Sequence, residues 1–130
     1  MKRLTPIVRI LMGLGFVTFG LNYFLQFLPA PTNIPPAAGQ FVGALVASGY
    51  VMTIVKVVEI GAGLLLLGNR FVPLALVLLA PVIVGFMGFH LALAPAGLPV
   101  PLVFLAFELF LAWQYRGTYA LLFDARRQPA

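Results

Sequence analysis

Cysteine is absent from this chain of 130 residues, and histidine occurs only once. Without cysteine the chain has no disulfide, no thiol redox relay and no thiolate metal site, whichever compartment its loops face. A single histidine also argues against a conventional histidine-rich metal centre, so we expect no metal site.

Charged residues are also scarce: Asp, Glu, Lys and Arg make up 8% of the chain, whereas hydrophobic residues make up 62%. With a mean hydropathy of +1.08, a soluble single domain would have no polar surface to present to water. The sequence therefore predicts an integral membrane protein whose first partner is the lipid bilayer. The net charge of +5 would suit nucleic acid only if the basic residues clustered on one accessible face, so no nucleic-acid partner is expected.

Four long apolar runs predict four spanning helices, because about 20 apolar residues cross a hydrocarbon core. The runs cover approximately residues 6–28, 50–67, 71–94 and 100–116. The expected fold class is all-α, an integral membrane four-helix bundle that forms a single domain over residues 1–130. A cleaved signal peptide is the competing interpretation of the first run, but that run is long and no A-x-A site follows it.

Thr5-Pro6 predicts the start of the first helix, and Gly68-Asn69 predicts the end of the second. Residues 37–48 are apolar but too short to span. They predict a short extra helix at the outer interface, between the first and second spans. Its small residues Gly39, Gly43 and Ala47 form a stripe that we expect to pack against a neighbour.

The basic residues fall on one side of the predicted topology. Seven of the eight flank the same ends of the runs: Lys2, Arg3, Arg9, Arg70, Arg116, Arg126 and Arg127. Lys and Arg stay on the cytoplasmic side of short loops, so both termini and the turn at residues 69–70 are predicted to be cytoplasmic. Lys56 is the exception.

Function, if the sequence shows it, lies in a few polar side chains inside the apolar runs: Asn22, Gln26, Lys56, Glu59, His90 and Glu108. Counted at about 1.5 Å per residue from the outer helix ends, three of them (Asn22, Lys56 and His90) lie roughly 6 to 9 Å deep. The same count puts Glu59 and Glu108 at about 13 Å, near the bilayer midplane. The candidate ligand-binding residues are therefore Lys56, Glu59, His90, Glu108 and Asn22, in two layers of the outer half.

Ionised groups near a bilayer centre cost about 2.5 to 3.5 kcal/mol each on insertion scales, so these side chains are expected to face one another. Lys56 and Glu59 are three residues apart on one helix face, where an ion pair forms easily. Glu108 has no partner on its own helix. It can meet His90, join Lys56 across the bundle, stay protonated, or share a proton with Glu59.

A purely structural role for these residues stays open, since intramembrane polar groups also fix which helices are neighbours. For His90, near the outer interface, a solvated or backbone-bonded imidazole is the simpler expectation. Asn22 and Gln26 are expected to make interhelical hydrogen bonds.

Several short stretches keep a distinctive order and spacing along the chain. They are Arg9-Ile-Leu-Met-Gly-Leu-Gly-Phe16, Phe19-Gly-Leu-Asn22, Glu59-Ile-Gly-Ala-Gly-Leu-Leu-Leu-Leu-Gly68, Arg70-Phe-Val-Pro-Leu-Ala75 and His90. Together they resemble the DoxX-like family of small bacterial membrane proteins. One departure is Tyr23, where many members of that family place Lys.

The resemblance implies a four-helix protein of the bacterial inner (cytoplasmic) membrane with a loose association with redox chemistry. Some members are subunits of thiosulfate:quinone oxidoreductases, and others belong to oxidative-stress complexes. It therefore implies a quinone as the cofactor to test for, and a redox partner subunit or a homo-oligomer as partners. Many members have no assigned activity, so whether this chain is an enzyme is left open.

Three functions from different classes follow. The first is a membrane subunit or accessory factor of a redox system with an outward-facing polar pocket for a quinone-like or other lipophilic ligand. Because the chain contains no electron carrier, it would need a bound cofactor or partner. The second is a small proton-coupled transporter. The third is a structural or assembly protein that docks through the stripe from Gly39 to Ala47.

Overall fold

The fold is entirely helical over residues 2–130, which the structure, a computed structural model, describes. The elements are α1 (Leu4–Leu25), α2 (Pro36–Ala47), α3 (Val51–Leu67), α4 (Val72–Ala92), η1 (Pro95–Gly97), α5 (Pro99–Gln114), α6 (Arg116–Tyr119) and η2 (Ala120–Phe123). The all-α prediction is confirmed. The long helices also lie where the apolar runs placed them.

Helix length and composition identify the candidate spans. α1 and α4, with 22 and 21 residues, are long and apolar enough to cross a membrane. α2 and α3 meet the same criterion only as a pair, and that pair is bent by 88°. α5 has 16 residues, fewer than the about 20 that cross a hydrocarbon core. The structure therefore supports a membrane protein with two candidate spans, or three if the bent pair is one span.

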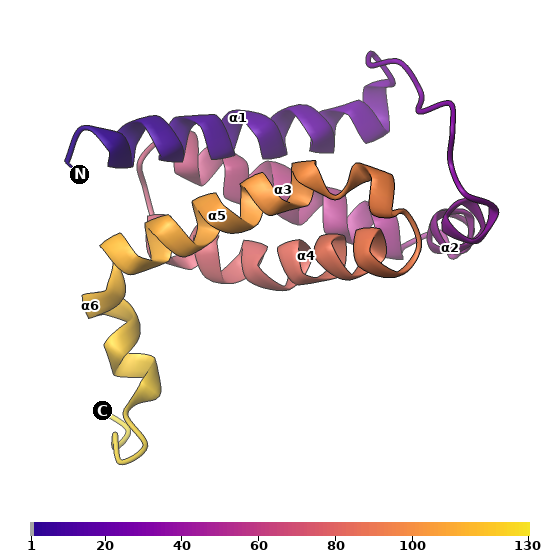
Figure 1. The fold of residues 1–130 in the computed structure, drawn as a ribbon. Helices are drawn as coiled ribbons and strands as arrows, with labels where there is room; N and C mark the ends of the chain where they lie inside the picture. Colours follow the sequence, from indigo (N-terminus) through magenta and orange to yellow (C-terminus); the bar gives the residue numbers. More distant parts are fainter. Residues whose placement is uncertain (1) are drawn as a thin grey trace.

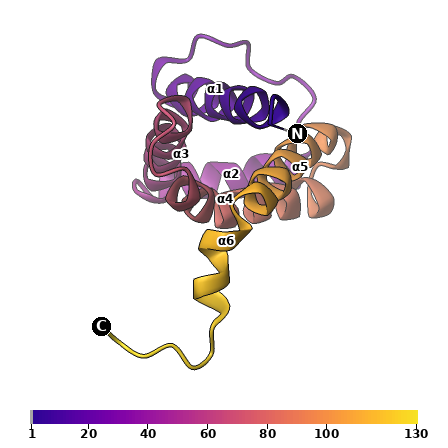
Figure 2. The same ribbon diagram turned by 90° about the vertical axis from the view of Figure 1, so that its left-hand side faces the viewer.

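The four long helices contact one another in a ring: α1 packs on α3, α3 on α4, α4 on α5, and α5 on α1. Figure 2 shows this ring from one end. Its centre holds fully buried side chains from every helix, among them Met12, Leu66, Leu79 and Leu111. α3 and α5 are not adjacent in this ring, so the packing of adjacent helices does not place their residues side by side.

The closest helix pair is α1 and α3, and glycine makes it possible. Gly13 of α1 faces Gly63 of α3, and Gly20 lies so near Ile60 that an added Cβ would stand 2.5 Å from the Ile60 Cγ1 atom. Small residues let helix backbones approach closely. In a lipid bilayer, where the hydrophobic effect does not drive helices together, this close van der Waals packing stabilises helix pairs. Gly15 instead forms the slot for a ring of α5, since its Cβ would lie 2.5 Å from Phe104 Cζ.

The stripe on α2 does not pack as predicted. No atom outside the helix's own backbone lies within 4 Å of a Cβ built on Gly43, and on Gly39 such a Cβ would meet only Ile34, at 3.9 Å. The buried residue is Ala38, one position away, so α2 turns a different face towards the body. α2 lies across the end of the helical body, next to α3 (Figure 1).

The start of α1 differs from the sequence prediction, whereas the end of α3 agrees with it. α1 begins at Leu4 with Arg3 as its N-cap and no side-chain cap hydrogen bond. Pro6 fits inside the first turn because the N–H that it lacks would have no intrahelical partner there. α3 ends at Leu67 as predicted, and Asn69 (φ 53°) takes the left-handed position that follows it. The amides of Asn69 and Arg70 bond back to the carbonyls of Leu66 and Leu65, at 3.3 and 3.1 Å.

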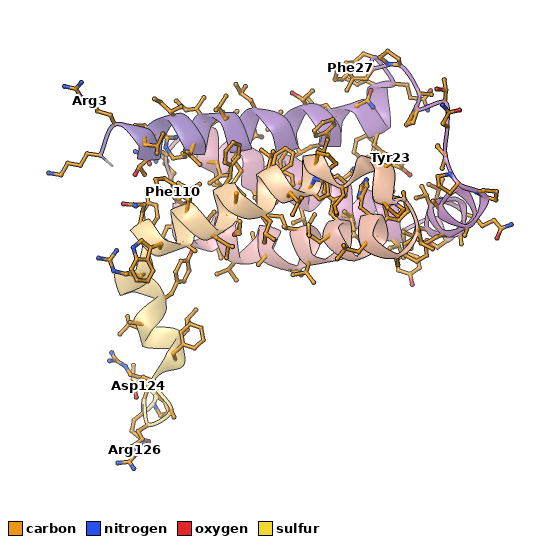
Figure 3. The ribbon with its side chains drawn as sticks, viewed as in Figure 1. Arg3, Tyr23, Phe27, Phe110, Asp124 and Arg126 are labelled. Atoms are coloured by element: carbon orange, nitrogen blue, oxygen red, sulfur yellow. The ribbon has the colours of Figure 1, made fainter. Side chains whose placement is uncertain are left out.

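Both termini lie at the same end of the helical body. Arg3 and Arg126 are near one end, whereas Tyr23 and Phe27 are at the other (Figure 3). After α5 the chain turns, and α6 and η2 run away from the body across its long axis (Figure 1). The side of a membrane on which this end lies stays a prediction from the charges.

Candidate functional site

Lys56 and Glu59 form an ion pair one turn apart on α3. The distance from Lys56 Nζ to Glu59 Oε2 is 3.0 Å, and the side chains are only 17% and 9% exposed. The pair that the spacing made geometrically easy is therefore present. It neutralises two charges together at a place shielded from solvent, which lowers the cost of having either one there.

The ion pair leaves the Glu59 carboxylate incompletely satisfied. Glu59 Oε2 is buried and faces the Lys56 ammonium at 3.0 Å, and among the described residues no other donor bonds to it. A carboxylate oxygen accepts hydrogen bonds from two directions. This oxygen thus keeps an acceptor position that the protein itself does not fill.

Glu108 is the second buried carboxyl, and within residues 2–130 it has no cationic partner. It is 7% exposed on α5, and its Oε1 atom has no hydrogen-bond donor. The predicted alternative in which Lys56 joins Glu108 across the bundle is not formed, since Lys56 pairs on its own helix. A buried polar atom without a partner is uncommon in folded proteins and calls for a specific explanation.

His90 bonds to its own helix. Its Nδ1 atom lies 3.0 Å from the Phe86 carbonyl oxygen, one turn earlier in α4. Because a carbonyl only accepts, Nδ1 is the protonated nitrogen. The ring packs edge-on against Phe86 and Phe89, at centroid distances of 4.7 and 5.0 Å, and lies over Gly97 of η1. Of the two expectations for this imidazole, the backbone-bonded one describes the structure.

Asn22 closes the end of α1, which corrects the expectation that it bonds between helices. Its Oδ1 accepts a hydrogen bond from the Leu28 amide at 2.8 Å, and its carbonyl accepts one from the Gln26 amide at 2.8 Å. Gln26 is exposed and left-handed (φ 52°). Both polar residues therefore serve the exit of the helix. The sequence feature that could have predicted this role is an asparagine shortly before a break in the apolar run.

The structure brings only Lys56 and Glu59 of the five candidate residues into direct contact. Two cavities are found elsewhere, both near the end that holds the termini. One, of about 330 Å³, is lined by Lys2, Thr5, Pro6, Arg9, Asn69, Gln114 and Tyr115. The other, a groove of about 360 Å³, is lined by Leu109, Ala112, Trp113, Arg116, Tyr119, Ala120 and Phe123. Neither is lined by a candidate residue.

Arg9 has a role that the sequence did not assign. Its Nη1 atom donates to the Leu66 carbonyl and, at 3.3 Å, to the Leu67 carbonyl. These carbonyls belong to the last turn of α3, where a helix presents unpaired acceptors and partial negative charge. Arg9 thus ties the start of α1 to the end of α3. Two features of the sequence could have predicted this contact: a cation at the predicted inner end of the first helix, and an uncharged C-terminus of the second helix at the same predicted depth.

Tyr119 fastens α6 to the start of α4. Its hydroxyl donates to the Pro73 carbonyl at 2.7 Å. Burial raises the pKa of Tyr119 to about 12, and the nearby charges of Glu108 and Tyr115 act in the same direction. The phenol therefore stays a donor throughout the physiological range.

Comparison with known proteins gives no match among family models, curated proteins or solved structures.

Proposed function

We propose that this chain is a four-span protein of the bacterial inner membrane, DoxX-like in kind, with both termini cytoplasmic. In this proposal it is a membrane subunit or accessory factor of a redox system, and it binds a quinone-like lipophilic molecule between its helices. The apolar helices, the ring in which α1, α3, α4 and α5 contact one another and the location of both termini at one end support it.

The observation that carries the proposal is a pair of buried carboxyl oxygens with few or no donors: Glu108 Oε1 has none, and Glu59 Oε2 faces only the Lys56 ammonium. Leaving a buried acceptor without a donor costs about 1 to 3 kcal/mol. A ligand hydroxyl would remove that cost. A quinol supplies two hydroxyl donors on an apolar ring, which suits carboxylates surrounded by aliphatic and aromatic side chains.

The same carboxyls suit the oxidised form once they carry a proton. A quinone carbonyl only accepts hydrogen bonds, so it needs a protonated carboxyl as its donor. Glu108 is the better candidate for this exchange, because no cation holds it in the ionised form. Glu59, paired with Lys56, would orient the ligand. Electrons would pass to or from a partner subunit, because the chain's own side chains include no electron carrier.

The test is native mass spectrometry with lipid extraction on protein purified gently from a bacterial membrane. We expect a quinone-like molecule with the wild type and with Asp124→Asn, a matched carboxyl-to-amide change in the exposed tail. Glu108→Gln should lose it while unfolding at the same temperature as the wild type.

Equal retention in Glu108→Gln, Glu59→Gln and the wild type would refute the proposal. Protein that carries only bulk phospholipid or a partner chain would favour the structural role instead. Proton-driven transport by reconstituted protein without a bound quinone would favour the transporter.

A further inference from the structure

The groove between α5 and the C-terminal tail has one charged side chain in an otherwise apolar wall. Leu109, Ala112, Trp113 and Phe123 line it, and Arg116 lies at its edge. It is an open surface groove of about 360 Å³. A small soluble anion would make no favourable contact with these apolar side chains. A ligand that fits needs both an anionic group and a long apolar part.

Arg116 is held in place but is not neutralised. Its Nη1 atom donates to the Trp113 carbonyl at 2.9 Å, and its Cζ atom lies 4.7 Å from the centre of the indole ring. Within residues 2–130 no carboxylate pairs with it. A guanidinium has five N–H donors in a planar fork that matches phosphate. Most of this fork therefore stays available to an incoming anion.

The tail beside the groove exposes a run of large apolar side chains. Leu121, Leu122 and Phe123 are 55%, 71% and 85% exposed, and Trp113 is 63% exposed. The tail runs across the long axis of the helical body (Figures 1 and 2). If the body crosses a membrane, the tail lies along the membrane surface, where such side chains insert among acyl chains.

We propose that this groove binds an anionic phospholipid, with the headgroup phosphate at Arg116 and an acyl chain along Leu109, Trp113 and Phe123. The basic residues at this end make an anionic leaflet its natural surface. The proposal rests on the membrane crossing of the proposed function and is independent of the quinone-like ligand. The acceptor oxygens of Glu59 and Glu108 take no part in it.

The experiment titrates the full-length protein in detergent with phosphatidylglycerol and, separately, with phosphatidylethanolamine of the same acyl chains, and counts bound lipids by native mass spectrometry. Arg116→Gln is the test variant, and Arg126→Gln is the matched control with the same charge loss on the same tail. We expect the wild type and Arg126→Gln to prefer phosphatidylglycerol. Arg116→Gln should bind it roughly tenfold more weakly, the loss expected for one charge-assisted hydrogen bond.

A second variant, Phe123→Ser, tests the apolar wall without touching the charge. It should weaken both lipids and leave the preference for phosphatidylglycerol intact. Equal losses in Arg116→Gln and Arg126→Gln would overturn the proposal, as would equal binding of the two lipids. Full competition by soluble glycerol phosphate, or a co-purified polypeptide that blocks lipid binding, would overturn it too. Glu108→Gln should bind phosphatidylglycerol normally whether or not the quinone-like ligand is found, so the two proposals fail separately.

Discussion

Gly13 and Gly63 bring the backbones of α1 and α3 into contact. A Cβ on Gly13 would lie 2.9 Å from the Gly63 carbonyl oxygen, and a Cβ on Gly63 would lie 3.0 Å from the Gly13 carbonyl oxygen. The relationship is reciprocal, so neither position has room for a side chain unless the helices move apart. This contact sets how closely α1 and α3 approach each other.

Gly63→Ala is therefore expected to destabilise the fold by about 1 to 3 kcal/mol, the usual cost of overpacking. Gly61→Ala is the matched control on the same helix, since nothing lies within 4 Å of its added Cβ. That variant should be neutral or slightly stabilising, because alanine has the higher helix propensity. Unfolding in mixed micelles with increasing denaturing detergent measures both. Similar losses in the two variants would contradict the close contact.

The buried ion pair predicts strong coupling between Lys56 and Glu59. Lys56→Met leaves a buried carboxylate without its counter-charge, which should cost about 3 to 5 kcal/mol of unfolding free energy. The double variant Lys56→Met/Glu59→Leu should recover most of that loss, because it removes both charges. Lys2→Met, at an exposed position, serves as the control. If the losses of unfolding free energy in Lys56→Met and in Glu59→Leu add up to the loss in the double variant, the pair contributes nothing.

His90 and Gly97 form a second steric pair, this time between α4 and η1. A Cβ on Gly97 would lie 2.6 Å from His90 Cδ2, so Gly97→Ala should displace the imidazole and lower stability. Adding His90→Ala should restore much of it, with a coupling of about 0.5 to 3 kcal/mol. Gly88→Ala, with open space around its Cβ, should have little effect. Thermal unfolding of the wild type, Gly97→Ala, His90→Ala, the double variant and Gly88→Ala measures these effects, and an unrelieved defect in the double variant would argue against the contact.

The hydroxyl of Tyr119 predicts a stability loss at high pH. Its pKa is raised to about 12 in the folded protein, against about 10 in an unfolded chain. Below pH 10 both states keep the proton, and the group contributes its full stability. Between pH 10 and about 12 the unfolded state loses the proton first, so stability falls as pH rises.

The check is the ultraviolet absorbance of phenolate, measured as the wild type minus Tyr119→Phe. The difference should show one titration centred near pH 12. A difference centred near pH 10 would mean that the phenol is neither shielded nor bonded to Pro73.

What the sequence predicted well depends on local pattern. The apolar runs located the long helices to within a few residues, since hydropathy and helix length need no knowledge of the neighbours. The same local pattern showed that Lys56 and Glu59 share one helix face, but it left open whether Lys56 pairs with Glu59 or with Glu108, and the structure shows the pair with Glu59. The resemblance to a family, the four-span count and the ligand remain predictions.

What the sequence missed depends on which helices are adjacent. Arg9 reaches a carbonyl 57 residues away, and Tyr119 reaches one 46 residues away. Glycine-rich segments occur in α1, α2 and α3, and composition alone did not tell the packed pair from the exposed stripe. Asn22 was misassigned because a polar residue near a helix end can serve either a neighbouring helix or its own loop.

The joint between α1 and α5 has a different consequence. It is the least extensive of the four contacts in the ring, and it depends on the ring of Phe104 seated at Gly15. Phe104 also packs against Phe16, with ring centroids 4.8 Å apart and the ring planes tilted by 49°. A ring of helices separates most easily at the interface with the least contact. If the protein lies in a bilayer, α1 and α5 are the neighbours that could separate with the least loss of contact, so the lipid-facing side of the ring is structurally uneven around its circumference.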